Sequence, residues 1–187
     1  MIGIAGPPGA GKSTLADTLC ARLNRDIAGE TALVVPMDGY HFDNDVLVAR
    51  NLLPRKGAPQ TFDAHGFHHL LLRLRAGEAE VAIPVFDRPR DLARAGARLV
   101  TSAQRILLVE GNYLLLKSEP WAPLKSLFDL TVFLPVAMPV LEARLIQRWL
   151  DHGIAQSAAE TRARSNDIPN AELVLAESQP ADFNLRY

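Results

Sequence analysis

The chain has 187 residues, 48% of them hydrophobic, and its 20 Lys and Arg against 21 Asp and Glu give a formal net charge of −1. This balance argues against a general binder of nucleic acids or membrane surfaces, and no apolar run approaches the ~18 residues of a membrane span. With Cys20 as the only cysteine no internal disulfide can form, so we expect a cytoplasmic protein of one domain, residues 1–187.

The first predicted elements are a short buried strand over Ile2–Ala5 and a helix over residues 12–25, in which Leu15 and Leu19 are four apart. The connection between them, GPPGAGKS at residues 6–13, matches the phosphate-binding pattern G-x-x-x-x-G-K-[ST]. Glycines let successive N–H groups point into one concavity, and the positive end of the following helix faces the same point. An ordinary glycine-rich turn is the alternative, but strand, turn and helix come in the order that the motif requires.

The motif predicts a task for the residues of this loop. Lys12 would reach the β- and γ-phosphates of a nucleotide, and the Ser13 hydroxyl would hold Mg²⁺. Pro7 and Pro8 have no N–H to donate, so the phosphate cradle should run from about Gly9 to Thr14. The expected nucleotide-binding residues of the loop are Gly6, Gly9, Ala10, Gly11, Lys12, Ser13 and Thr14.

A second apolar strand is predicted over Ala32–Met37, and it ends in the sequence DGYH at residues 38–41. In open parallel sheets ligands collect at the carboxyl ends of the strands, so Asp38 should lie near the phosphates. An ionised carboxylate there can accept the proton of an attacking hydroxyl or hold a metal-bound water. An aspartate that caps a helix or a turn is the alternative.

Residues 43–50 are predicted to form a short helix, followed by a loop over residues 51–61 that two prolines and a glycine interrupt. Within this loop, Arg55 and Lys56 could meet an anionic substrate or a phosphate, or form a solvated turn. Loops of this length are often functional, and both interpretations stay open.

A longer helix is predicted from the N-cap Asp63 to about Ala76. It carries His65, His68 and His69 at spacings that could place ligands on one face. No Cys or Glu completes a zinc set with them, so histidines on a helix surface are favoured over a metal site.

Val81–Phe86 is a third strand-like run, and its proline marks an edge or irregular strand. It leads into DRPRD at residues 87–91, where alternating acids and arginines could bind a polar substrate or pair with one another in a solvated turn. Ile106–Val109 is the clearest buried parallel strand, and it ends in Glu110. An acid in this position of a phosphate-loop protein organises the Mg²⁺ shell, with a capping or packing glutamate as the alternative.

A helix from residue 138 to about residue 150 begins with a proline in its first turn. Arg144 and Arg148 are four apart on one face of this helix. Two guanidinium groups so placed suit a lid, at about residues 138–165, that closes over transferring phosphoryl groups. Surface arginines that pair with Glu142 or Asp151 are the alternative.

The remaining predicted elements are a strand over Leu127–Leu134, a helical piece with Arg162 and Arg164, a polar loop over residues 165–170 and a last strand over Leu173–Leu175. Residues 176–180 would follow where an adenine ring could be held. Strands that alternate with helices around a phosphate loop predict a three-layer α/β fold, with a mainly parallel five-stranded sheet flanked by helices.

Taken together, these segments resemble the phosphoribulokinase/uridine kinase family. The resemblance is carried by GPPGAGKSTLA, PMDGYH, RKGAP-x-TFD, PVFDR, VEGNYLLL and NDIPNA, and it spans nearly the whole chain. The segments look closest to the bacterial branch similar to pantothenate kinase, which includes nucleoside kinase-like proteins and fructose-transport-system kinases. Many families share the phosphate loop, whereas DGYH combined with EGNYLL at this spacing is more specific.

The resemblance implies ATP-dependent phosphorylation of a hydroxyl on a small molecule, with Mg²⁺ as the accompanying ion. By matching motif positions it implies that Asp38 is the catalytic base and that Glu110 organises the metal together with Ser13 and Asp38. Lys12, Arg144 and Arg148 would complete the catalytic set. The residues implied to lie at the acceptor are Asp38, Tyr40, His41, Asp87, Arg88 and Tyr113, and Asn170 would lie near the nucleotide base.

We therefore predict a kinase that transfers the γ-phosphoryl group of MgATP to a hydroxyl of a sugar, nucleoside or pantothenate-like acceptor. The alternative is a phosphate-loop ATPase or a nucleotide-binding regulatory protein that acts on a protein partner. A GTPase would usually carry N-K-x-D, which this sequence lacks, and intact Lys12, Ser13, Asp38 and Glu110 speak against lost catalysis. Small kinases of this kind are often dimers, so a homodimer is one assembly to test.

Overall fold

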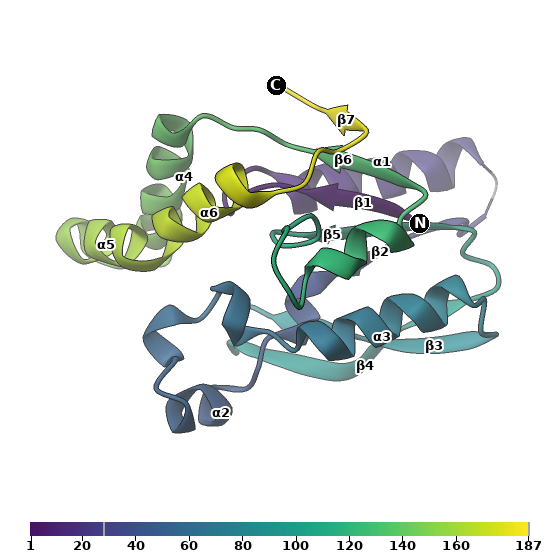
Figure 1. Ribbon diagram of the computed structural model, residues 1–187, viewed down its shortest axis with the longest axis horizontal. Coiled ribbons are helices and arrows are strands. Elements are labelled where there is room, and N and C mark those ends of the chain that lie inside the picture. Colours follow the sequence, from purple (N-terminus) through teal and green to yellow (C-terminus); the bar gives the residue numbers. More distant parts are fainter. Residues whose placement is uncertain (28, 187) are drawn as a thin grey trace.

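Five parallel strands form a central sheet in the order β2-β5-β1-β6-β7 (Figure 1). The computed structural model describes residues 1–27 and 29–186. The prediction of an α/β fold with a mainly parallel five-stranded sheet flanked by helices is confirmed. The strands of this sheet are β1 (Ile2–Ala5), β2 (Ala32–Pro36), β5 (Ile106–Gly111), β6 (Leu130–Phe133) and β7 (Phe183–Asn184).

Helices cover both faces of the sheet and make it the middle of three layers (Figure 1). One face packs against α1 (Lys12–Asp26), α4 (Met138–Asp151) and α6 (Ile168–Glu177). The other packs against α3 (Ala64–Arg75) and the 3₁₀ segment η4 (Ala122–Leu127). The N-cap prediction for α3 is confirmed, because the Asp63 carboxylate accepts a hydrogen bond from the Gly66 N–H at 2.8 Å.

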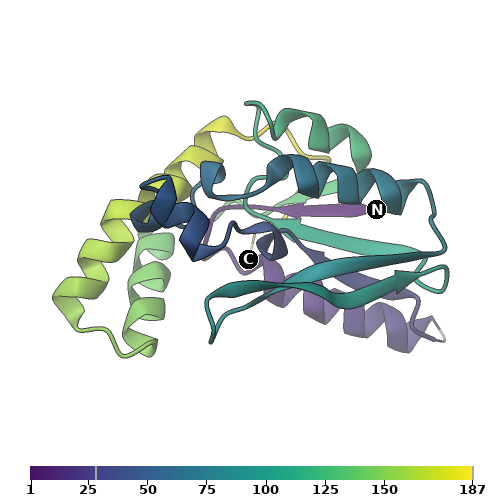
Figure 2. The ribbon, with the colours of Figure 1, turned by 90° about the horizontal axis from the view of Figure 1, so that it is seen from below.

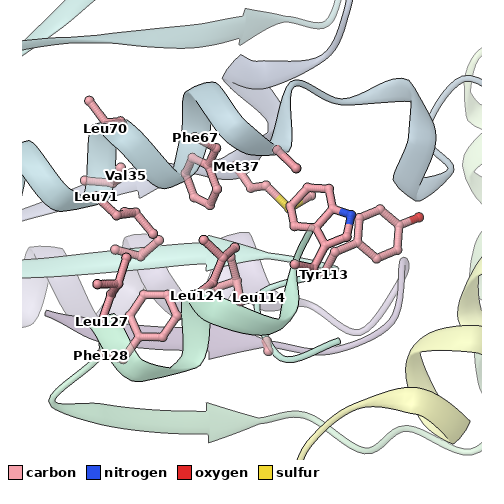
Figure 3. Close-up of a cluster of buried hydrophobic side chains, with 14 of the residues drawn as sticks. Val35, Met37, Phe67, Leu70, Leu71, Tyr113, Leu114, Leu124, Leu127 and Phe128 are labelled. Carbon is pink, nitrogen blue, oxygen red and sulfur yellow. The ribbon is translucent and has the colours of Figure 1, made fainter. Parts of the chain in front are cut away.

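The two cores arise because successive side chains of a strand point to opposite faces of the sheet. In β2, Val34 belongs to the core beneath α1 and α4, and its neighbour Val35 belongs to the core beneath α3. In β5, Leu108 likewise belongs to the core beneath α1 and α4, and Val109 belongs to the core beneath α3. Figure 3 shows the second core, in which leucines of α3 and η4 meet around Phe67. The continuous apolar runs of the sequence are therefore central strands that are covered on both sides.

A separate antiparallel hairpin of β3 (Glu80–Asp87) and β4 (Leu92–Thr101) packs against the 3₁₀ turn η1 (Met37–Tyr40) (Figure 2). The strand predicted over Val81–Phe86 is thus confirmed, and it lies outside the central sheet. We did not predict β4, because half of its residues are exposed and its sequence, LARAGARLVT, consists largely of alanine, arginine and glycine, with few β-branched and no aromatic residues.

The hairpin also covers the edge strand β2. The guanidinium of Arg98, on β4, donates a hydrogen bond to the Val34 backbone carbonyl at 2.8 Å. Two segments that are 64 residues apart in the sequence are joined by this bond.

Two predictions near the C-terminus are wrong. Leu173–Leu175, predicted as a strand, lies within α6, and residues 165–170, predicted as a loop, form a π-helical turn η5 (Ala163–Asp167) and the start of that helix. A short apolar run has no periodicity that separates a strand from a buried helix. Pro169, which we took as part of a loop, occupies the first turn of α6, where proline is well tolerated.

The remaining elements are short and lie at one end of the molecule, near the carboxyl ends of the strands (Figure 1). They are α2 (Asn44–Ala49), η2 (Leu53–Arg55), η3 (Pro59–Thr61) and α5 (Gln156–Arg162). The short helix predicted at residues 43–50 is confirmed by α2. Within the described residues, we find no helix with the length and apolar character needed to cross a membrane.

Gly39 is expected to be intolerant of even one added methyl group. A Cβ atom at this position would lie 2.5 Å from the Pro84 carbonyl oxygen, which belongs to the backbone of β3. Gly39→Ala must therefore push the hairpin away from η1, and we expect the free energy of unfolding to fall by about 1–3 kcal/mol. Chemical denaturation of the two proteins measures this change. An unchanged midpoint would show that the hairpin is not held against η1 in solution.

Candidate active site

Three neighbouring strands, β2, β5 and β1, have their carboxyl ends side by side at the same edge of the sheet. Glu110 of β5 is in register with Ile4 of β1 and with Pro36 of β2, and Asp38 follows two residues after Pro36. The phosphate loop begins directly after β1. Because these ends are adjacent, the loop and both acids open into the same cleft, of about 640 Å³.

The backbone of the phosphate loop has the geometry of an anion cradle. Gly9 and Gly11 have φ values of 80° and 87°, in the left-handed region that glycine adopts without strain. Helix α1 starts at Lys12, and the N–H groups of a first helical turn have no intrahelical acceptor. They lie at the positive end of the helix dipole, beside the cleft. This arrangement suits a phosphate group.

Three charged side chains converge beside the cradle. Lys12 is 7% exposed, and its Nζ donates a hydrogen bond to the Pro7 carbonyl at 2.9 Å. Burial lowers the pKa of Lys12, while Glu110 and Asp38 act in the opposite direction. Burial and, next, the neighbouring Asp38 carboxylate raise the pKa of Glu110 to about 7, although Lys12 and a hydrogen bond from the Ser13 hydroxyl act in the opposite direction. A buried and a partly exposed carboxylate, with a hydroxyl oxygen nearby, have the chemistry of a site that takes a cation.

Asp38 is further held by two contacts. Its carboxylate accepts a hydrogen bond from the Arg88 guanidinium at 2.9 Å, which brings the turn of the β3–β4 hairpin to the end of β2. Its backbone carbonyl lies 2.8 Å from Nδ1 of His41, so that nitrogen carries the proton. Burial lowers the pKa of His41, which favours a neutral ring whose Nε2 can accept a hydrogen bond.

A second part of the cleft lies beyond Asp38, between the hairpin and the loop that follows α2. Its wall is aromatic, because the ring centroid of His41 lies 4.0 Å from that of Phe62 and 4.6 Å from that of Phe86. Lys56 lies over the Phe86 ring, and its Nζ is 2.9 Å from the Asp91 carboxylate. Apolar ring faces beside single polar groups are typical of small-molecule pockets.

Helix α4 reaches the cleft from the other side. Arg144 donates a hydrogen bond to the Gly9 carbonyl at 3.2 Å, and Arg148 lines the cleft. Arg148 also forms an ion pair with Asp167 at 3.0 Å. Arg144 thus contacts the phosphate loop, Arg148 both lines the cleft and pairs with an acid, and Glu142 pairs with Arg164. The role of the two arginines in a lid stays a prediction.

Arg55 is bonded to the segment around η5. Its guanidinium donates hydrogen bonds to the Ser165 carbonyl at 2.8 Å and to Oδ1 of Asn170 at 3.3 Å. Asn166 donates in return to the Lys56 carbonyl at 2.7 Å. Arg55 therefore joins the loop after α2 to the turn η5, while the neighbouring Lys56 side chain enters the cleft.

The structure brings most of the predicted site residues together. The cleft is lined by Gly9, Gly11, Lys12, Ser13, Thr14, Asp38, His41, Arg88, Glu110, Arg148 and Asn170. The other predicted residues, Gly6, Ala10, Tyr40, Asp87, Tyr113 and Arg144, are not among the residues that line it.

Two of the residues predicted to bind the phosphate acceptor instead contact other parts of the protein. The Tyr40 ring lies 5.2 Å from that of Phe67, and the Tyr113 hydroxyl donates to the Gly57 carbonyl at 2.5 Å. In Figure 3 the Tyr113 ring lies at the end of the core with its hydroxyl pointing out of it. Tyr113 thus supports the loop that carries Lys56 from behind.

Several lining residues were missed from the sequence: Asn44, Phe62, Phe86, Asn112, Trp149, His152 and Arg162. Most belong to segments that come next to the cleft only through long-range packing. Trp149 had a local signal, because it directly follows Arg148 near the end of a predicted lid helix.

The comparisons with known proteins agree with this geometry. The model of the phosphoribulokinase/uridine kinase family matches residues 1–153, so the chain belongs to this family. A solved relative from Silicibacter sp. TM1040, named "putative fructose transport system kinase", is 47% identical, with a TM-score of 0.93 over 98% of this chain and 88% of that one. Protein YggC of Escherichia coli K12 is 35% identical over 96% of this chain and 74% of its own length. A pantothenate kinase of Myxococcus xanthus is 36% identical over 80% of this chain, which corresponds to 49% of that enzyme.

The protein is accordingly a phosphotransferase that acts on an alcohol group, of the uridine kinase, phosphoribulokinase and pantothenate kinase type. The recognition made from the motifs is confirmed.

Proposed function

We propose that this enzyme transfers the γ-phosphoryl group of MgATP to a hydroxyl of a small sugar, nucleoside or pantothenate-like acceptor. The observation that carries the proposal is that Lys12, Ser13, Asp38 and Glu110 line one cleft, with the aromatic pocket of His41, Phe62 and Phe86 directly beside Asp38. The cradle takes the phosphates of the nucleotide, and the aromatic pocket takes the acceptor.

In this mechanism the loop amides and Lys12 bind the β- and γ-phosphates. Asp38 accepts the proton of the acceptor hydroxyl as its oxygen bonds to the γ-phosphorus, and the bond from that phosphorus to the β–γ bridging oxygen breaks to release ADP. Arg88 holds the Asp38 carboxylate in place through their ion pair. The lid at residues 138–165 closes over the phosphates, with Arg144 and Arg148 facing the charge that develops on them.

The residues present fit Mg²⁺, because hydroxyl and carboxylate oxygens are its preferred ligands. Ser13 and Glu110, with Asp38 beside them, would hold it. No three acidic, His or Cys side chains gather as a metal cage within the part of the chain that the structure describes, which fits an ion that shares its ligands with substrate phosphates and water. When bound, Mg²⁺ neutralises charge on the β- and γ-phosphates.

The test is ADP release from MgATP with a panel of hydroxylated acceptors: sugars, nucleosides, pantothenate and glycerate. Turnover that appears with one acceptor class and is absent without acceptor would support the proposal and name the substrate. Steady ADP release that no acceptor increases would overturn it in favour of an ATPase.

Glu110 should make stability fall as the pH rises in Mg²⁺-free buffer. Its pKa of about 7 in the folded protein exceeds the ordinary value of 4.5, so the folded state binds more protons between these two pH values. The free energy of unfolding should decrease by on the order of 1–3 kcal/mol as the pH rises from about 4.5 to about 7, because ionising the buried carboxyl costs more in the fold.

Denaturation in EDTA at a series of pH values measures this effect, with Glu110→Gln as the comparison. The variant should lose this part of the pH dependence. If both proteins have the same pH profile, the carboxyl of Glu110 does not titrate in this range.

A further inference from the structure

Asp167 joins two consecutive residues of the lid helix through a single carboxylate. One oxygen, Oδ2, accepts a hydrogen bond from the Trp149 indole N–H at 2.6 Å. The other, Oδ1, lies 3.0 Å from a terminal nitrogen of Arg148. The Asp167 side chain is only 11% exposed, against 37% for Arg148. Both oxygens of a largely buried acid are therefore committed to the end of α4.

The position of Asp167 depends on the π-helical turn η5 between α5 and α6. A π-helical turn is wider than an α-helical one and is common at functional sites. Both Asn166 and Asp167 are buried here, and Asn166 is bonded to the Lys56 carbonyl across the cleft. The carboxylate is thus fixed from the side opposite to the helix that it contacts.

Arg148 faces the phosphate cradle from this position. It lines the same cleft as Lys12 and Ser13, and its positive charge lies close enough to Lys12 to lower the pKa of the Lys12 ammonium. The guanidinium has five N–H donors in a rigid plane, so one edge can bind Asp167 while another remains directed at a phosphoryl oxygen. The indole of Trp149 is itself covered by the Arg162 guanidinium, which lies 4.1 Å from a ring centroid of Trp149.

We propose that Asp167 is a positioning residue, which holds the Arg148 guanidinium at the mouth of the phosphate cradle and directs it at the γ-phosphate. The inference rests on the proposed function, since it requires a nucleoside triphosphate in the cleft. Arg148 is then placed before the substrate arrives, so less side-chain entropy is lost when it meets the phosphate. Trp149 completes the arrangement by fixing the second carboxylate oxygen.

The test compares two nucleotides that differ only beyond the β-phosphate. Calorimetric titration measures the affinity for MgADP and for the Mg²⁺ complex of AMP-PNP, a non-hydrolysable triphosphate. In Asp167→Asn the amide oxygen can still accept from Trp149, but the charge that holds Arg148 is gone. We expect the preference for AMP-PNP over ADP to fall about 3–10-fold, and the ADP affinity to change less than about twofold.

Arg148→Ala should lower the same preference, and adding Asp167→Asn to it should then change nothing further, because Asp167 acts through Arg148. Glu142→Gln is the matched control. It breaks the ion pair of Glu142 with Arg164, at 3.2 Å, which also joins α4 to η5 but lies at the surface, and the preference should stay at its original value. Thermal unfolding of each variant confirms that it is folded under the titration conditions.

Equal losses of affinity for both nucleotides in Asp167→Asn, or additive effects in the double variant, would show a merely structural role and overturn the inference. A preference that rises would also overturn it, since Asp167 would then restrain Arg148 away from the phosphate. Failure of the original protein to bind either nucleotide would reject the proposed function itself. Normal binding with an unchanged preference in Asp167→Asn rejects the role of Asp167 alone.

Discussion

Asp38→Asn is expected to lower the rate of phosphoryl transfer by about 10²-fold or more while ATP binding stays nearly intact. The amide cannot take up the proton of the acceptor hydroxyl, whereas the phosphate cradle consists of loop backbone and Lys12, which the substitution leaves in place. Asp38 is well situated to be a base: its side chain is 23% exposed, and it lies between the cradle and the aromatic pocket.

The measurement pairs turnover on the acceptor identified from the panel with the dissociation constant for MgATP. Asp45→Asn is a suitable control, because Asp45 is an exposed carboxylate on the neighbouring helix α2. If Asp38→Asn reduces binding and turnover by the same factor, Asp38 contributes to nucleotide binding and is not the base.

Lys12→Ala is expected to weaken MgATP binding about 10–100-fold and to abolish measurable transfer. A hydrogen bond to a charged group contributes roughly 1.5–3 kcal/mol, which corresponds to that range of affinity. The loss has a second cause within the protein. Glu110 loses the cation that lowers its pKa, so its carboxyl should hold a proton to a higher pH and bind Mg²⁺ less well at neutral pH.

Titration calorimetry at two pH values separates the two causes, because raising the pH should restore part of the Mg²⁺ affinity and none of the direct phosphate contact. Lys117→Ala, at an exposed lysine, serves as the control. Turnover that is unchanged in Lys12→Ala would remove the phosphate loop from the mechanism.

The nucleotide side of the cleft could be predicted because each of its residues directly follows a local signal. Lys12 and Ser13 lie in a motif with four fixed positions, and Asp38 and Glu110 each end an apolar run that had to be a buried strand. Once these runs were parallel neighbours, their ends had to meet at one edge of the sheet.

The acceptor side and the lid contacts could not be predicted in this way. Phe86 and Asp91 line the cleft because a hairpin packs against η1, and one strand of that hairpin, β4, consists largely of alanine, arginine and glycine, which are not typical of strands. Asp167 meets Arg148 through a π-helical turn in a segment that we predicted to be a loop. These contacts depend on which surfaces pack together, and one sequence does not encode that choice in a local pattern.

The bond between Arg98 and the Val34 carbonyl also bears on how copies of the protein behave toward one another. An edge strand presents unpaired backbone groups to any other strand that approaches, and Ala32–Val35 of β2 is a short, uncharged run of apolar residues that another strand could pair with. Here the hairpin places a cation on one of those carbonyls, and Pro36 contributes no N–H at the end of the strand. A sheet edge with a bound cation and a proline is a poor template for a strand of a second chain. The contact between Arg98 and Val34 therefore also disfavours edge-to-edge association of two copies of the protein.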